Sequence, residues 1–234
     1  SVIIEKYIAD AKEVFFNFTI QEGYCSVSTA YTRYLNNSIQ GINPLPIMNV
    51  YPTKHLDEFM QLYRNKFEKL FCSIGYLNGV AQAEGFYHPA EGFLFFEGGI
   101  RLGGTQSYVL TQHINGINSL ELFIELALTG RMQKYSVKDL DNPYFNKACC
   151  NIYVSLKPGC IAHIDGLDKI EAMDEVLNVS RMAGIGDRIE KTGSLKHVAF
   201  RIHMAADNSI LLSKAIENLF SLLVVLDSDG QDMV

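Results

Sequence analysis

The first third of the sequence is a series of runs rich in β-branched and aromatic residues, each followed by a brief polar break. We expect antiparallel strands at residues 2–8, 14–20 and 24–35, joined by short hairpin turns. Residues 36–52 contain three prolines and a glycine. Because proline cannot donate to a strand ladder, this segment is predicted to be a loop that does not pair centrally in a sheet.

One long amphipathic helix is expected next. Apolar residues recur at three- and four-residue spacing over residues 56–71, and Thr53 is positioned to cap the free amides of the first turn. Two more strands are predicted at 80–87 and 93–97, with a short turn between them. Short helices should follow, the second running from Ser119 to a glycine terminator at Gly130.

The pattern changes at about residue 135, where strand-like runs become shorter. Four strands are expected there, at residues 150–156, 160–164, 177–182 and 195–204. A second amphipathic helix is predicted at 209–223, capped by Asp207 or Ser209, and it should pack on these strands.

These elements predict an α+β fold class, with an antiparallel sheet, flanking helices and a small β-rich C-terminal domain. The change of pattern places the division between residues 1–134 and 135–234. The chain also begins at Ser1, directly inside an apolar run. We therefore expect it to be part of a longer protein.

Charge and composition exclude several function classes. The 20 basic residues are outnumbered by 26 acidic ones, giving a formal charge of −6, and no basic stripe breaks this balance, so a nucleic-acid partner is not expected. The longest apolar run, residues 219–226, is interrupted by a serine and is far shorter than a bilayer span, so no membrane partner is expected either. Five cysteines without C-x-x-C spacing indicate reduced thiols and a cytoplasmic protein.

A pair of carboxylates is the most informative chemical feature. Glu84 and Glu97 lie on two neighbouring predicted strands, and the glycine-rich segment 98–104 with Arg101 follows at once. A carboxylate at the end of an apolar strand needs a cation, and proteins hold Mg²⁺ with one or two carboxylates plus water and phosphate. The alternative is a partly exposed salt bridge of about 0–1 kcal/mol with glycines that serve turns. Residue types alone leave both interpretations open.

The segment from Phe95 to Gly104 resembles the metal-binding strand of ATP-grasp ligases, whose pattern is hydrophobic-E-x-N-x-R-x-G-G. Glu84 stands where that superfamily has its other metal-binding acid, and residues 2–8 resemble its hinge strand along adenine. The resemblance covers residues 1 to about 130. The remainder is similar in layout to the small C-terminal domain of the carbamoyl-phosphate-synthase-like and amino-acid-ligase branches.

The resemblance implies an ATP-dependent carboxylate–amine ligase. In that family ATP, with Mg²⁺ or Mn²⁺, phosphorylates a carboxylate, and an amine then displaces the phosphate. The implied partners are ATP, a small carboxylate and a small amine, with a homodimer as the expected assembly. Six residues receive a role, as a catalytic arginine, three nucleotide contacts and two metal ligands: Arg101; Glu5, Tyr7 and Glu13; Glu84 and Glu97.

Two departures from the family pattern affect these expectations. Gly99 stands at the position of the family's asparagine, normally a metal ligand, so one metal ion is expected to be lost or weakly held. The family's N-terminal half, with its phosphate-binding lysines and lid, should precede Ser1. We therefore expect this chain alone to have no ligase turnover and weak or no ATP binding. The alternative is a non-catalytic nucleotide-binding or dimerisation module of the same fold.

Overall fold

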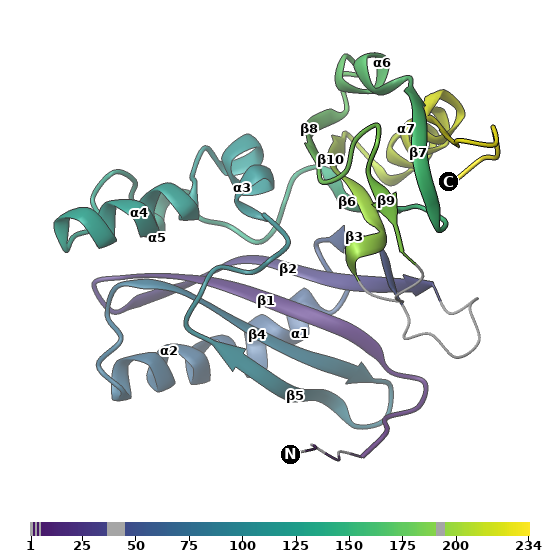
Figure 1. Ribbon diagram of the computed structural model, residues 1–234. Coiled ribbons are helices and arrows are strands. Elements are labelled where there is room, and N and C mark those ends of the chain that lie inside the picture. Colours follow the sequence, from purple (N-terminus) through teal and green to yellow (C-terminus); the bar gives the residue numbers. More distant parts are fainter. Residues whose placement is uncertain (1, 3, 5, 37–44, 191–194) are drawn as a thin grey trace.

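A long antiparallel sheet runs through the molecule (Figure 1). The computed structural model describes residues 2, 4, 6–36, 45–190 and 195–234. The sheet has eight strands in the order β5-β4-β1-β2-β3-β6-β10-β8, and each neighbouring pair is antiparallel. Its strands are β1 (Lys12–Gln21), β2 (Tyr24–Asn36), β3 (Leu45–Tyr51), β4 (Gly79–His88), β5 (Gly92–Gly99), β6 (Ala148–Ser155), β8 (Val176–Arg181) and β10 (Val198–Ala206).

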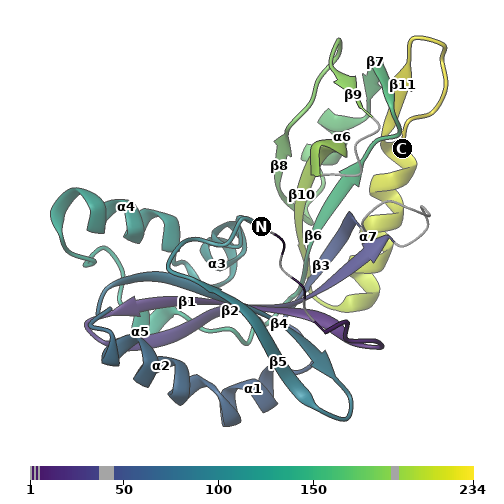
Figure 2. The ribbon, with the colours of Figure 1, turned by 60° about the horizontal axis from the view of Figure 1, so that its bottom comes forward.

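A second sheet and the helices flank these strands. The second sheet has the order β11-β7-β9, from β7 (Gly159–Asp165), β9 (Arg188–Ile189) and β11 (Val224–Asp227). The helices are α1 (Leu56–Leu62), α2 (Arg64–Ser73), α3 (Tyr108–Asn115), α4 (Ser119–Thr129), α5 (Val137–Leu140), α6 (Leu167–Glu171) and α7 (Ser209–Leu222). Helices α1 and α2 cover one face of the β4-β1-β2 region, and α3 and α4 lie over the opposite face (Figure 2). None of the helices within the described ranges has the length and apolar character needed to cross a bilayer.

The two faces of β1 have different roles. Phe16 and Phe18 point to the helix side, where the Phe16 ring stacks on Phe59 of α1 with centroids 3.5 Å apart. Because side chains alternate along a strand, Phe15 and Asn17 point to the other face. The larger aromatic core therefore lies on the helix side, whereas the other side combines polar residues with a smaller apolar cluster that contains Phe15, Tyr31 and Tyr51.

The predicted α+β architecture with a large antiparallel sheet is confirmed, but two segments differ from expectation. The described residues within 2–8 lie outside any strand, so the predicted first strand was wrong there. Residues 36–52 were predicted to be unpaired, whereas β3 pairs with both β2 and β6. The sheet accommodates Pro46 because it lies beside a shift of register, where a regular ladder bond is not needed.

Helix boundaries also differ from the predicted ones. The expected single helix is two, because Tyr63 leaves helical geometry at φ −124° between α1 and α2. The N-cap residue of α1 is His55 rather than Thr53. Thr53 Oγ1 accepts from His55 N at 3.4 Å and lies 2.7 Å from Thr32 Oγ1. Helix α7 is capped by Asn208, whose side chain accepts from Leu211 N at 3.0 Å, and not by the predicted Asp207 or Ser209. Gly130 ends α4 in the left-handed conformation, as predicted.

The proposed division at residues 134 and 135 stays a prediction. Strands β6, β8 and β10 come from the second part of the chain, yet they continue the sheet that β1 to β5 begin. The second, three-stranded sheet lies wholly in that second part. The continuous sheet connects the two parts through the contact of β3 with β6.

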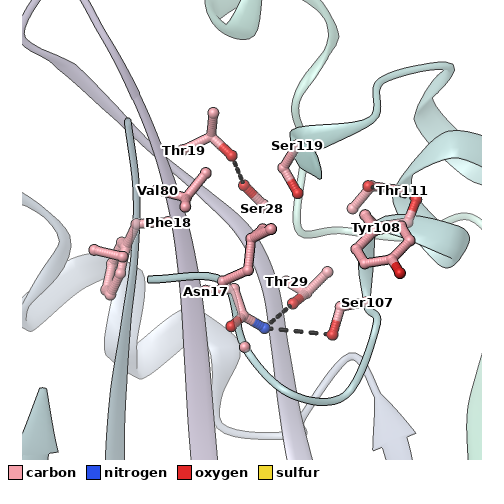
Figure 3. A pocket seen from close by; sticks show the side chains of 13 residues that line it. Asn17, Phe18, Thr19, Ser28, Thr29, Val80, Ser107, Tyr108, Thr111 and Ser119 are labelled. Atoms are coloured by element: carbon pink, nitrogen blue, oxygen red, sulfur yellow. Dashed lines mark hydrogen bonds between the residues drawn. The ribbon is translucent and has the colours of Figure 1, made fainter. Parts of the chain in front are cut away.

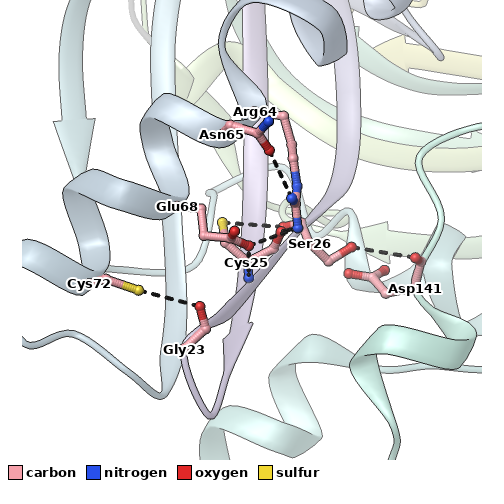
Figure 4. A network of polar contacts seen from close by, with 8 residues as sticks. All are labelled: Gly23, Cys25, Ser26, Arg64, Asn65, Glu68, Cys72 and Asp141. Carbon is pink, nitrogen blue, oxygen red and sulfur yellow. Dashed lines mark hydrogen bonds and ion pairs between the residues drawn. The ribbon is translucent and has the colours of Figure 1, made fainter.

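A buried carboxyl group lies beside β2 on the side away from α2 (Figure 4). Asp141 Oδ2 accepts a hydrogen bond from Ser28 Oγ at 2.6 Å, and Ser28 Oγ lies 2.6 Å from Thr19 Oγ1. Across the strand, Arg64 donates to Glu68 at 2.7 Å and to a main-chain carbonyl. Burial raises the pKa of Asp141 from 3.8 to about 6.

Asp141 should make stability depend on pH. Since the folded state holds the proton up to about pH 6 and the unfolded state only to 3.8, stability falls as pH rises through that window. Asp141→Asn stays neutral and keeps an acceptor for Ser28. Urea unfolding at pH 4 and pH 8 should therefore show the wild type losing about 2 kcal/mol relative to the variant. A difference between the two proteins that does not change with pH would contradict this.

Gly166 should tolerate no side chain. It has φ 85° between β7 and α6, and an added Cβ would collide with the main-chain oxygen of Leu222 at the end of α7. We expect Gly166→Ala to lower the free energy of unfolding by about 2–4 kcal/mol. Gly184→Ala, in open space at an ordinary backbone conformation, is the matched control and should change it by less than about 0.5 kcal/mol. If the two variants lowered the free energy of unfolding equally in urea denaturation, a steric requirement for glycine at position 166 would be refuted.

Candidate functional site

Two carboxylates face each other across neighbouring strands on the polar side of the sheet. Glu84 of β4 and Glu97 of β5 are direct partners in the antiparallel register, so their side chains lie on the same face. Arg101, in the loop after β5, places its Nη2 atom 3.2 Å from Glu97 Oε1 and 3.8 Å from Glu84 Oε1. The structure therefore brings these three residues into one cluster.

The cluster has more negative than positive charge. The Glu84 side chain is 18% exposed, against 51% for Glu97. Burial and the neighbouring charge of Glu97 raise the pKa of Glu84, while Arg33 and Arg101 act in the opposite direction. Two carboxylates share one nearby arginine, so the site favours a further cation.

The donor set fits Mg²⁺ or Mn²⁺ held partly by other ligands. Within the described residues, no group of three or more histidine, cysteine, aspartate or glutamate side chains is arranged to hold a metal ion. Mg²⁺ commonly takes only one or two carboxylates and completes its shell with water and phosphate oxygens. Glu84 and Glu97 supply that number of carboxylates.

Gly99 offers no ligand atom beside this pair. A Cβ added there would lie 3.4 Å from both Cγ and Nε of Arg101, so the arginine side chain occupies the space next to residue 99. An asparagine at this position would have to share that space with Arg101.

The loop after Arg101 is anchored on the same face by buried side chains from distant strands. Thr105 O accepts from Asn151 Nδ2 at 2.9 Å and from His203 Nε2 at 3.0 Å. Gly104 O accepts from Arg201 Nη1 at 2.7 Å. Burial lowers the pKa of His203 to about 4, so this side chain is a neutral donor at pH 7. The position of Arg101 thus depends on β6 and β10.

A second anchor joins the loop to β1 and β2 (Figure 3). Asn17 Nδ2 donates to Thr29 Oγ1 at 2.7 Å and to Ser107 Oγ at 3.4 Å, at the edge of a cavity of about 20 Å³. That volume is enough for about one water molecule. Gly103 passes so close that an added Cβ would lie 2.5 Å from Asn17 Oδ1. A side chain at position 103 would therefore displace the amide of Asn17 from its present position.

A groove lies next to the cluster, where the N-terminal segment passes the ends of β1 and β2. Its volume is about 540 Å³, and Tyr7, Glu13, Arg33 and Phe86 are among the residues that line it. The Tyr7 residue is 88% exposed, and Glu13 Oε2 lies 3.4 Å from Arg33 Nη1. Two of the three expected nucleotide contacts thus meet in one groove. The third, Glu5, lies outside the described residues.

Arg33 is a site residue that the sequence interpretation missed. Its guanidinium carbon lies 3.9 Å from the centre of the Phe15 ring, and its charge acts on Glu84. The available signal was alternation along the predicted strand at 24–35, which puts Arg33 on the same face as Tyr31.

Solved structures share this fold over nearly the whole chain. An L-amino acid ligase from Bacillus licheniformis matches 94% of this chain with a TM-score of 0.76 and 16% identity. A phosphoribosylglycinamide synthetase from Anaerococcus prevotii matches 97% with a TM-score of 0.76 and 13% identity. The biotin carboxylase domain of the Hydrogenobacter thermophilus 2-oxoglutarate carboxylase, solved with MgADP and bicarbonate, matches 98% with a TM-score of 0.73 and 14% identity.

The predicted ATP-grasp fold is therefore confirmed. The chain covers 55%, 55% and 48% of those three structures, which is about half the length of each. No family model and no curated protein matches the chain by sequence.

The coupling inside the cluster can be measured directly. Glu97→Gln removes a neighbouring negative charge and should lower the pKa of Glu84, whereas Arg101→Gln removes a positive charge and should raise it. Titration of the ¹³C-labelled carboxyl resonances by NMR gives the pKa in each variant. A Glu84 pKa that moves in neither variant would exclude the close contact described above.

Proposed function

We propose that this chain forms the C-terminal half of the nucleotide site of an ATP-dependent ligase that joins a carboxylate to an amine. The observation that carries the proposal is the opposed pair Glu84 and Glu97, with Arg101 between them in a fold shared with ATP-grasp ligases. Glu84 and Glu97 hold Mg²⁺ or Mn²⁺ in this proposal. The metal, when bound, neutralises charge on the phosphate oxygens of ATP.

The groove beside the cluster receives the nucleoside. Its volume of about 540 Å³ lies within the range of small-molecule pockets. The half-buried carboxylate of Glu13 accepts hydrogen bonds from the ribose hydroxyls, and its contact with Arg33 holds it in place. The exposed ring of Tyr7 and the main chain next to it contact adenine.

Arg101 is the catalytic residue in this proposal. Half of its side chain is exposed, and its planar fork binds two phosphate oxygens at once. Charge on a transferred phosphoryl group is spread over its oxygens, so a fixed guanidinium stabilises the transition state mainly by position. The phosphorylated carboxylate is then attacked by an amine, which releases phosphate.

Gly99 favours a second candidate, a nucleotide-binding module without turnover. A glycine supplies no side-chain oxygen, which leaves two carboxylates as metal ligands. Gly99→Asn tests the two candidates. A rise in affinity for Mg-nucleotide favours the module that has lost a ligand, whereas loss of ligase activity on Arg101→Ala in the complete protein favours the enzyme.

The chain alone is expected to release no phosphate from ATP. It covers about half the length of the structures that share its fold, so a ligase of that size would need groups beyond these 234 residues. Colorimetric detection of phosphate with the purified chain and Mg-ATP checks this. ATP-dependent phosphate release would contradict it.

Binding of Mn²⁺ tests the proposed function on the chain itself. With ADP present, Mn²⁺ should broaden the NMR signals of residues around Glu84 and Glu97 selectively, and Glu97→Gln should weaken Mn²⁺ binding about tenfold or more. The matched control is Glu217→Gln on the exposed face of α7, which should leave binding unchanged. Broadening elsewhere on the chain, or equal affinity in all three proteins, would refute the metal site.

A further inference from the structure

Two arginines and a tyrosine meet on the polar face of the sheet, away from the carboxylate pair. Tyr153 of β6 is the direct partner of Arg201 on β10, and the Arg201 guanidinium carbon lies 5.1 Å from the centre of the tyrosine ring. Arg33 of β2 reaches the same place, since its charge and that of Arg201 both act on the Tyr153 hydroxyl. Asn49 of β3 donates to that hydroxyl through Nδ2 at 2.9 Å. We call Arg33, Asn49, Tyr153 and Arg201 the two-arginine cluster.

Several buried polar atoms of this cluster have no hydrogen-bond partner. Among the described residues, Arg33 Nε, Arg201 Nε and Asn49 Oδ1 are buried and unpartnered. Folded proteins pair the great majority of such atoms, because a buried donor without an acceptor is costly. Two unpartnered N–H donors from two charged groups at one place indicate an acceptor that binds there.

The cluster also carries excess positive charge. Arg33 Nη1 lies 3.4 Å from Glu13 Oε2, so the carboxylate of Glu13 balances one of the two positive charges. Arg201 makes no ion pair with any residue that the structure describes, and its Nη1 donates only to the main-chain oxygen of Gly104. Water molecules would satisfy the unpartnered atoms but would not balance the second guanidinium. An anion does both.

The shape of the unpartnered donors favours a carboxylate. In both arginines Nη1 is already engaged, while Nε is unpartnered. The Nε edge of a guanidinium presents two parallel N–H groups, which match the two oxygens of a carboxylate. The Tyr153 hydroxyl adds a third donor beside them.

The cluster lies within reach of a ligand bound at the carboxylate pair. Glu84 is the register partner of Phe15, and the Arg33 guanidinium lies over the ring of that same residue. Strands β4 and β2, which carry Glu84 and Arg33, are separated only by β1, a distance of about 10 Å. Arg201 lies further along the sheet, but its Nη1 donates to the oxygen of Gly104, which follows Arg101 by three residues, at most about 11 Å along the chain. A small molecule with two acidic groups spans such a distance.

We propose that the two-arginine cluster binds a second acidic group of the substrate, so that the carboxylate compounds used by this protein are dicarboxylic acids. One carboxylate is then the group activated beside Arg101, and the other is held by Arg33, Arg201 and Tyr153. The identification of the ligand as substrate rests on the proposed function, whereas the binding of the anion does not.

Calorimetric titration with two probes tests the proposal. Glutarate and valerate have the same chain length, but valerate lacks the second carboxylate. In the presence of Mg²⁺ and without nucleotide, glutarate should bind about tenfold more tightly or better, since a charge-assisted hydrogen bond contributes that much. Arg201→Gln should abolish this difference, and Arg188→Gln, an exposed arginine on β9, should retain it. Equal binding of the two probes by the wild type would overturn the proposal.

A second variant protects against a folding artefact. Tyr153→Phe removes only the hydroxyl and should weaken glutarate binding about threefold while valerate binding stays unchanged. If Tyr153→Phe and Arg201→Gln both bind glutarate like the wild type, the cluster is not the site. Inorganic phosphate that binds as tightly as glutarate, with the same loss on Arg201→Gln, would assign the cluster to nucleotide phosphate and overturn the dicarboxylate claim.

These outcomes are independent of the metal experiment. The titrations contain no nucleotide, so the proposed function fails alone if Mn²⁺ and ADP do not bind at Glu84 and Glu97 while glutarate binding remains. The dicarboxylate proposal fails alone if Mn²⁺ and ADP bind at Glu84 and Glu97 while glutarate binds no more tightly than valerate.

Discussion

Repulsion between two carboxylates held opposite each other is the interaction on which the rest of the site depends. Like charges directly opposed on an antiparallel pair are unfavourable, and partial burial of Glu84 increases the cost. Arg101 offsets this only in part, because one guanidinium serves two acids. The strands therefore keep an arrangement that a divalent cation would complete. Arg101, in the glycine-rich loop, places its guanidinium against both acids.

The alternation of side chains along β1, β2 and β4 gives the two faces of the sheet different contents. On one face, aromatic residues stack on α1 and α2 and form a core that needs no polar atoms. On the other face, polar side chains from strands far apart in sequence hold the loop that carries Arg101, beside a smaller apolar cluster that contains Phe15 and Tyr31. His203 and Asn151 are fully buried in doing so. Substitutions in either group would thus disturb different properties, overall stability in the first case and the position of Arg101 in the second.

Local features of the site were predictable from sequence, and long-range ones were not. Glu84, Glu97 and Arg101 lie within one hairpin and its following loop, so a short turn was enough to place them together. Arg33 and Arg201 come from β2 and β10, which share one sheet only because β3 and β6 lie between them. The pairing of β3 with β2 and β6 was not predicted, because the prolines of this segment favoured a loop. Strand periodicity also does not indicate which distant strands pair. The ATP-grasp fold was recognised from the motif around Glu97 rather than from periodicity.

A crystal structure of this chain with Mn²⁺ and ADP would test the central claim most directly, because anomalous scattering locates the metal ion. The account predicts a peak between the carboxylates of Glu84 and Glu97, within bonding distance of both, with Arg101 moved from Glu97 to a phosphate oxygen. A metal ion bound only elsewhere, with the contact between Arg101 and Glu97 unchanged, would contradict it.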